Sequence, residues 1–344
     1  MKTQYANAVT QYENGTSLGG RIIKEGGLVV FPTETVYGLG ANGLNSEAVL
    51  RIFAAKGRPA DNPLILHIAK KSELKPLWSH VPDNARILAD TFWPGPLTMI
   101  FNRSSIVPDE VTAGLDTVAV RMPLNKTARA LINAAGAPTA APSANLSGKP
   151  SPTTAEHVRQ DMDGRVDLII DGGPCKYGLE STVVSLIGRP TILRPGAVTK
   201  EMLEAVIGPV DVAHAVLSPL REGETAASPG MKYRHYAPDA EVVVAEGKER
   251  EIAAKICREY DAREAAGEDC IIFATKQTQP FYRGRNCVII GDRTEPATLC
   301  ASLFYSLREY GDRADVIFAE ALPNDDMGLA YMNRLLRSAG FNII

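Results

Sequence analysis

Residues 26–38 read Gly-Gly-Leu-Val-Val-Phe-Pro-Thr-Glu-Thr-Val-Tyr-Gly, and this stretch decides the fold of the first half of the chain. Its apolar run, Leu28 to Phe31, lies between a glycine pair and Pro32, which predicts a short buried strand. The polar residues between Pro32 and Gly38 predict a shaped loop at the carboxyl end of that strand, where open α/β sheets bind their ligands. A threonine-rich loop can equally satisfy its own backbone, so the sequence leaves both interpretations open.

Similar apolar runs and helical patterns continue from this stretch to about residue 212. Ser46 is expected to cap a helix that runs toward Lys56, and Thr153 another that runs to Gln160. The apolar runs on either side of 187–190 predict a hairpin. Because strands and helices are mixed in this way, we expect an α/β domain whose sheet is only partly parallel. The expected strands are 28–31, 64–68, 97–101, 117–121, 166–170, 182–186 and 191–193, and the other expected helices are 83–92 and 126–135.

The second part of the chain predicts a separate domain. Residues 213–239 are rich in proline and glycine, which is typical of a linker. Beyond them, expected strands at 242–244, 270–273, 287–290 and 316–319 alternate with helices at 248–262, 298–310 and 329–338, as in a small doubly wound sheet. We therefore expect one domain over 1–212, a linker or lid over 213–239, and a second domain over 240–344.

Composition excludes several classes of protein. The chain has 344 residues, 45% of them apolar, and a formal net charge of -3. This charge argues against a surface devoted to nucleic acid, although a local basic face stays open. The five cysteines are scattered and form no Cys-x-x-Cys pair, which excludes a disulfide framework and a thiolate zinc site. No apolar signal segment or membrane-spanning run is present, so we expect a reduced, cytoplasmic protein without membrane contact.

Two short clusters carry most of the chemical information. The Lys-Gly-Arg cluster, Lys56 to Arg58, offers two cations, and the Ser-Ala-Asn cluster, Ser143 to Asn145, offers hydroxyl and amide groups. Together they suit a nucleotide triphosphate, whose charge is spread over many oxygens. The cations also lie near an expected helix C-terminus, where they would complement the helix dipole. Asn62 favours the binding interpretation, because it can extend a polar wall.

Three further features have two interpretations each. His67 lies inside an apolar run, which favours a hydrogen-bonded core histidine. Arg121 ends an expected strand, where it can clamp a carboxylate or simply face solvent. The segment 231–236 combines cations, a histidine and aromatic rings within the linker, so it is either a solvated tether or a lid over phosphates.

At these residues the chain resembles the threonylcarbamoyl-AMP synthase family in its long, two-domain form. The resemblance covers essentially the whole chain, without a departure from the family pattern. It runs through the motifs at 32–39, 56–59, 62–64, 93–98, 120–123, 141–148, 181–183, 193–196, 228–231 and 235–238.

The resemblance implies a twisted mixed-sheet domain of the YrdC type with a concave cavity, followed by a smaller Rossmann-like domain. It implies that L-threonine, bicarbonate and ATP give threonylcarbamoyl-AMP and pyrophosphate, with Mg²⁺ held mainly by the ATP phosphates. A tRNA threonylcarbamoyl transferase would receive the product, and direct contact with tRNA stays open. The implied threonine-site residues are Thr35, His67, Arg121, Ala141 and Ser181. The implied ATP-site residues are Arg58, Asn62, Thr117, Ser143, Ser151, Arg194 and Tyr233, and the implied catalytic residues are Lys56, Arg58, Ser143 and Asn145.

Two rival functions stay open at this point. A double-stranded RNA or tRNA-binding module would use a basic concave face without turnover, and its binding would depend steeply on salt. A carbamoyl-transfer protein of hydrogenase maturation contains a similar domain, but such proteins also carry Cys-x-x-Cys zinc pairs, which this chain lacks.

Overall fold

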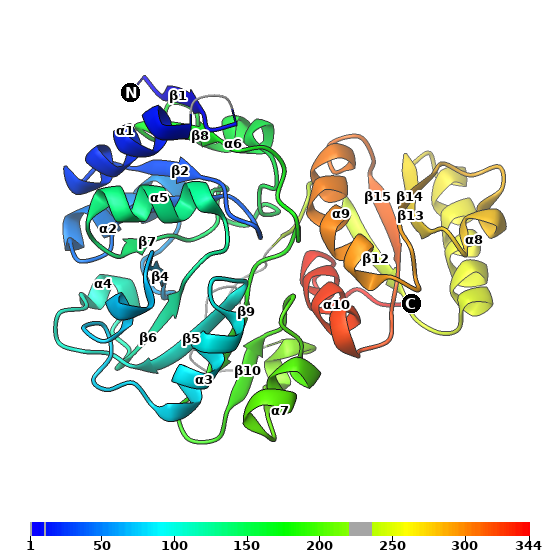
Figure 1. Cartoon of the computed structure of the whole chain (residues 1–344). Coiled ribbons are helices and arrows are strands. Elements are labelled where there is room, and N and C mark those ends of the chain that lie inside the picture. Colours follow the sequence, from blue (N-terminus) through cyan, green and yellow to red (C-terminus); the bar gives the residue numbers. More distant parts are fainter. Residues whose placement is uncertain (1, 10–11, 220–235) are drawn as a thin grey trace. The chain divides into compact units, whose positions relative to one another are not determined.

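A computed structural model describes residues 2–9, 12–219 and 236–344 of the chain (Figure 1). The chain divides into two compact units, one of residues 1–147 and 151–232, the other of residues 148–150 and 233–344. The short segment Gly148–Pro150 therefore belongs with the second unit although its neighbours in sequence belong with the first. Most of the expected linker, residues 220–235, lies outside the described residues.

The first unit is built on one mixed sheet of 11 strands in the order β1-β8-β2-β3-β7-β4-β6-β5-β9-β10-β11. Parallel pairs such as β4 with β6 and β5 with β9 alternate with antiparallel ones such as β5 with β6, so the expectation of a partly parallel sheet is confirmed. The strands are β1 Gln4–Asn7, β2 Val29–Phe31, β3 Gly38–Asn42, β4 Ile65–His67, β5 Leu97–Asn102, β6 Thr117–Arg121, β7 Thr139–Ala140, β8 Leu168–Asp171, β9 Thr182–Ser185, β10 Thr191–Arg194 and β11 Asp211–Val212. The helices are α1 Tyr12–Lys24, α2 Ser46–Lys56, α3 Asp83–Phe92, α4 Asp109–Thr112, α5 Lys126–Ala135, α6 Ala155–Met162 and α7 Lys200–Ile207, with 3-10 turns η1 Lys71–Leu74 and η2 His214–Val216.

The two faces of this sheet have different neighbours. Side chains alternate along each strand, so Leu66 and Val120 lie on one face, and helices α2, α3, α4, α6 and α7 pack against that face to form the largest core. Helices α1 and α5 pack on the opposite face, where it bears Phe31 and Leu168. The strand registers place His67 and Arg121 on this second face as well. They lie beside a small apolar cluster formed by Ile65, Ile100, Ala119 and Val183. The predicted site residues of β4 and β6 thus share one face of the sheet.

Two predicted helix caps are each off by one residue. Asn45, not Ser46, caps α2, because its side chain accepts a hydrogen bond from the Ala48 amide at 3.1 Å. Thr154, not Thr153, caps α6 through the amide of His157. In both places the sequence offers two adjacent residues with capping side chains, and propensity alone does not choose between them.

Two glycine-containing elements, α1 and β3, were not expected from the sequence. Glycine is a poor helix former, yet α1 contains Gly19 and Gly20 because α5 packs closely against it. A β-carbon on Gly20 would lie 2.4 Å from that of Ala134, and one on Gly19 would lie 2.5 Å from Leu131. Strand β3 begins at Gly38, which was expected only to close a loop; its backbone pairs with β2 and β7.

The second unit contains a parallel sheet of 4 strands in the order β12-β15-β13-β14. Helix α8 packs on one face, while the Tyr310 ring of α9 contacts Phe273 on the other, and α9 packs against α10 (Figure 1). The predicted doubly wound arrangement is confirmed. The elements are β12 Glu241–Ala245, α8 Glu249–Ala265, β13 Cys270–Thr275, η3 Gln279–Tyr282, β14 Cys287–Gly291, α9 Pro296–Tyr310, β15 Val316–Glu320 and α10 Asp326–Ser338.

Candidate active site

Lys56 joins the two clusters that the sequence analysis singled out. Lys56 is the last residue of helix α2, which Gly57 caps with a left-handed φ of 61°, and only 3% of Lys56 is exposed. Its Nζ donates to the carbonyl oxygens of Ser143 at 2.5 Å and Asn145 at 2.6 Å. A role limited to the helix dipole is therefore wrong, because the ammonium group holds a turn that lies 87 residues away.

The Ser-Ala-Asn cluster is also attached to the loop that follows β2. Ser143 forms a bridge with Gly38, and the Ala144 amide donates to the Tyr37 carbonyl at 2.9 Å. Within the cluster, the Ser143 hydroxyl donates to Asn145 Oδ1 at 2.6 Å. The structure thus brings together the stretch 32–38 and both clusters, which the sequence separates.

Arg58, Asn62 and Thr117 lie toward the same end of the β4–β6 pair. Arg58 Nη2 donates to the Asn62 carbonyl at 2.9 Å. Asn62 precedes Ile65 by three residues and Thr117 precedes Ala119 by two, and Ile65 pairs with Ala119. The Asn62 side chain is fully buried, yet neither its Oδ1 nor its Nδ2 has a hydrogen-bond partner among the described residues. Because a buried amide without partners is costly, Asn62 is a strong candidate for contact with a ligand.

Arg121 and Thr35 meet at the other end of the same strand pair. Arg121 is 4% exposed, so a solvated strand end is wrong. Its Nη1 donates to Thr35 Oγ1 at 2.9 Å, and its Nη2 forms an ion pair with Glu34 at 2.5 Å. Thr33, in contrast, bonds to the Val36 carbonyl and so satisfies its own loop, as one of the two interpretations predicted.

Glu34 is a site residue that the sequence analysis missed. Burial alone would raise the pKa of its carboxyl, but the charge of Arg121 and backbone hydrogen bonds outweigh burial and lower the pKa below its ordinary value. Glu34 therefore stays ionised, and its second oxygen accepts from the Asn125 amide at 3.2 Å. The only signal in the sequence is a carboxylate placed inside an otherwise neutral, buried loop.

His67 pairs with Arg121 in the β4–β6 register and is buried. Its Nδ1 lies 3.2 Å from the Ile65 carbonyl oxygen, which confirms the hydrogen-bonded core histidine. Burial, and next the charge of Arg121, lower the pKa of His67 to about 3, so the ring is neutral at physiological pH. Ala141 is the residue directly after the neighbouring strand β7, and its amide donates to the same Ile65 carbonyl oxygen at 3.0 Å.

Ser181 and Arg194 form a second polar group on the sheet. Arg194 donates from Nε to the Ser181 carbonyl and from Nη2 to its hydroxyl, each at 3.1 Å. The Ser181 hydroxyl also lies 2.7 Å from Thr98 Oγ1, whose residue pairs with Arg121 in the β5–β6 register. Ser151 is fully buried and donates to Glu180 at 2.5 Å, a partner that the sequence analysis did not identify. The last predicted residue, Tyr233, lies outside the described residues.

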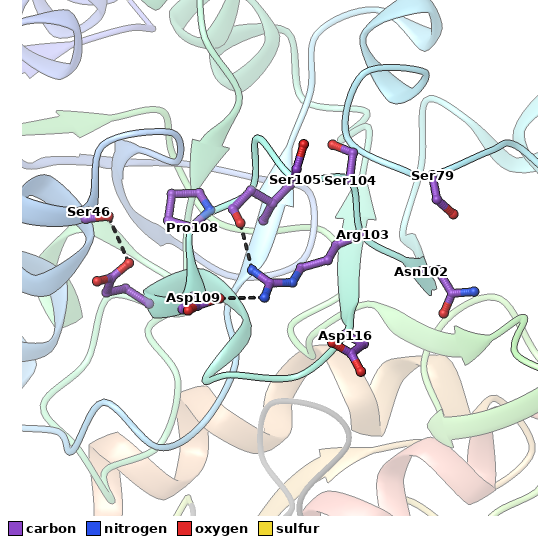
Figure 2. A pocket seen from close by; sticks show the side chains of 11 residues that line it. Ser46, Ser79, Asn102, Arg103, Ser104, Ser105, Pro108, Asp109 and Asp116 are labelled. Atoms are coloured by element: carbon purple, nitrogen blue, oxygen red, sulfur yellow. Dashed lines mark hydrogen bonds and ion pairs between the residues drawn. The ribbon is translucent and has the colours of Figure 1, made fainter.

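A pocket of about 830 Å³ lies around Arg103 and is lined by Asn102 and Asp116, the strand partner and the chain neighbour of Thr117 (Figure 2). Its polar groups largely satisfy one another: Arg103 pairs with Asp109 at 2.5 Å, and Ser46 donates to Glu110 at 2.8 Å. None of the predicted site residues lines it. In the part of the chain that the structure describes, no group of three or more His, Cys, Asp or Glu side chains can hold a metal ion, and no helix is long and apolar enough to cross a membrane.

Comparisons with known proteins agree with the arrangement of these motifs. A family model described as telomere recombination matches residues 21–196, and one for the C-terminal domain of threonylcarbamoyl-AMP synthase matches residues 198–340. Threonylcarbamoyl-AMP synthase of Pyrococcus abyssi is 48% identical over 94% of this chain and 93% of its own length. The chain belongs to the threonylcarbamoyl-AMP synthase family.

Other members of the family support the same conclusion. Threonylcarbamoyl-AMP synthase of Bacillus subtilis is 47% identical over 94% of this chain and 92% of its own length. The crystal structure of P. abyssi Sua5 complexed with L-threonine superposes with a TM-score of 0.92 at 44% identity, covering 100% of this chain and 99% of that one. The two-domain fold expected from the resemblance is therefore the fold of the family.

Proposed function

We propose that this chain is an L-threonylcarbamoyladenylate synthase, a nucleotidyltransferase that makes threonylcarbamoyl-AMP and pyrophosphate from L-threonine, bicarbonate and ATP. The observation that carries the proposal is the bonding of Lys56 to the backbone of Ser143 and Asn145, which unites both signature clusters in one buried site. Membership of the family, and a relative of known structure that is complexed with L-threonine, support the choice of substrates.

The proposed reaction asks little covalent chemistry of the protein. The threonine amine combines with carbon dioxide from bicarbonate to give a carbamate and a proton. A carbamate oxygen then attacks the α-phosphorus of ATP, the bond to the bridging oxygen breaks, and pyrophosphate leaves. Positioning and stabilisation of charge dominate such a step.

The ATP end of the site is proposed to involve Arg58, Asn62, Thr117, Ser143, Ser151 and Arg194. Among them, Arg58 and Arg194 carry charge suited to phosphate oxygens. Lys56 bonds to carbonyl oxygens instead, so its proposed role is to hold the Ser143 hydroxyl in place. Since the described residues contain no metal-ligand cluster, we propose that Mg²⁺ enters on the phosphates of ATP.

The threonine end is proposed to involve Thr35, His67, Arg121, Ala141 and Ser181. Arg121 is suited to the substrate carboxylate, and neutral His67 adds no charge beside it. We further propose a cytoplasmic enzyme that passes its product to a tRNA threonylcarbamoyl transferase.

Pyrophosphate release tests this function. The purified chain is incubated with ATP and Mg²⁺, and L-threonine and bicarbonate are each omitted in turn. Release should require both, while Lys24→Met, a change at the exposed end of α1, should leave the rate unchanged. Equal release without threonine would overturn the proposal. Salt-sensitive binding of RNA without turnover would instead favour the RNA-binding module, which the names of the relatives do not favour.

A further inference from the structure

Glu34 and Arg121 form a buried ion pair at the proposed threonine site. The two side chains are 6% and 4% exposed, and they meet across 87 residues of sequence. Charged groups taken out of water are costly unless they are paired and hydrogen-bonded. A pair in this position is therefore expected to serve a purpose other than stability.

Arg121 retains hydrogen-bonding capacity, and Glu34 retains its negative charge. Arg121 uses three N–H groups, one from each nitrogen, on Gly95, Thr35 and Glu34. A guanidinium group has about five N–H donors, so each terminal nitrogen keeps one. Glu34 accepts from Arg121 through one oxygen and from the Asn125 amide through the other, and backbone groups at Leu124 and at Glu34 itself also stabilise its negative charge.

These remaining groups match the head of a free amino acid. An α-amino acid at neutral pH carries a carboxylate and an ammonium group on the same carbon. Arg121 offers donors and positive charge, and Glu34, bonded directly to it, offers negative charge. The two side chains therefore form a receptor of complementary charge for a zwitterion, with no net charge of its own.

We propose that Glu34 is a specificity-determining residue that binds the α-ammonium group of L-threonine while it holds Arg121 against the carboxylate. The inference rests on the proposed function and adds to it a residue that the family resemblance did not assign. It explains why the loop carries a carboxylate at the point where Thr35 and Arg121 meet. It also predicts discrimination against carboxylic acids that lack the amine.

Calorimetry with two ligands tests the inference. The ligands are L-threonine and its α-hydroxy analogue, in which a hydroxyl replaces the ammonium group, and the protein is compared with Glu34→Gln. Glutamine keeps the size and one acceptor oxygen but removes the charge. We expect the intact chain to prefer threonine by about tenfold or more, because the analogue replaces a hydrogen bond between two charged groups with one from a neutral hydroxyl. In Glu34→Gln the preference should fall to near unity, since Arg121 is left uncompensated and still attracts either carboxylate.

The controls separate recognition from folding. Glu110→Gln removes the same charge from a carboxylate bonded to Ser46 and should keep the full preference. Glu34→Asp withdraws the carboxylate by one methylene group, so this variant's preference for threonine over the analogue should fall between those of the intact chain and Glu34→Gln. If Glu34→Gln does not fold, Glu34→Asp alone tests the inference. Equal weakening of both ligands in the Glu34 variants would overturn the inference and leave the proposed function standing. Failure of the intact chain to bind threonine would overturn both.

Discussion

Replacement of Lys56 by methionine tests whether its ammonium group maintains the site before any ligand binds. Methionine preserves much of the buried stem but removes the donor to Ser143 O and Asn145 O. A buried carbonyl that loses a charged donor costs about 1–3 kcal/mol, so two of them predict a loss of about 2–6 kcal/mol. That is a large part of the stability of a typical domain, about 5–15 kcal/mol.

Urea denaturation, monitored by tryptophan fluorescence, measures the change in the free energy of unfolding of the first unit. The chain has 2 tryptophans, Trp78 and Trp93, and both are buried in the first unit. The free energy of unfolding of that unit should fall in Lys56→Met without ATP present. Lys24→Met, at the exposed end of α1, should change it by less than about 0.5 kcal/mol. A Lys56→Met variant that is as stable as this control, and is impaired only in binding ATP, would refute the reasoning and make Lys56 a phosphate ligand.

Two further predictions follow from buried polar groups. The pKa of His67 is about 3 in the folded chain and near its ordinary 6.5 when the chain is unfolded. The unfolded state therefore binds more protons, and the free energy of unfolding should fall as pH decreases from about 6.5 toward 3. In His67→Gln, a pH titration of unfolding should lack this component, and an unchanged slope would contradict the neutral assignment. Asn62→Leu removes two amide atoms without hydrogen-bond partners among the described residues, so the ligand-free variant should be at least as stable as the intact chain while its affinity for ATP falls. Thermal melting measures the stability and calorimetry measures the affinity. A large loss of stability with normal ATP binding would show that the amide serves the fold.

Local sequence patterns predicted the elements that depend on local physics. The helices at Asp83–Phe92 and Lys126–Ala135 and the strand at Thr117–Arg121 have the predicted bounds. In α5 the reason is plain, because Asn125 caps the helix and Gly136, with a φ of 68°, ends it. Helix α1 and strand β3 could not be predicted in this way, since close packing against other elements, not intrinsic propensity, accounts for their glycines.

The site shows the same division between local and distant causes. The residue types of Lys56, Ser143 and Asn145 indicated a polar site, but no local pattern could show that one side chain bonds to the backbone of the other two. The sequence patterns did not identify Glu34 for the same reason. Its importance arises from Arg121, a partner that only the pairing of distant strands brings within reach.

Strand β6 sets the distance between the two ends of the proposed site. Thr117 and Arg121 are its first and last residues and lie on one face, and four residues of strand at about 3.3 Å each separate them by about 13 Å. Since side chains on one face of a strand recur every two residues, the strand fixes this separation in steps of two residues. Adding or removing one residue would turn one of the two side chains to the opposite face, and a change of two would alter the separation by about 7 Å. The spacing between the two ends of the proposed site can thus change only by whole pleats of this strand, not continuously.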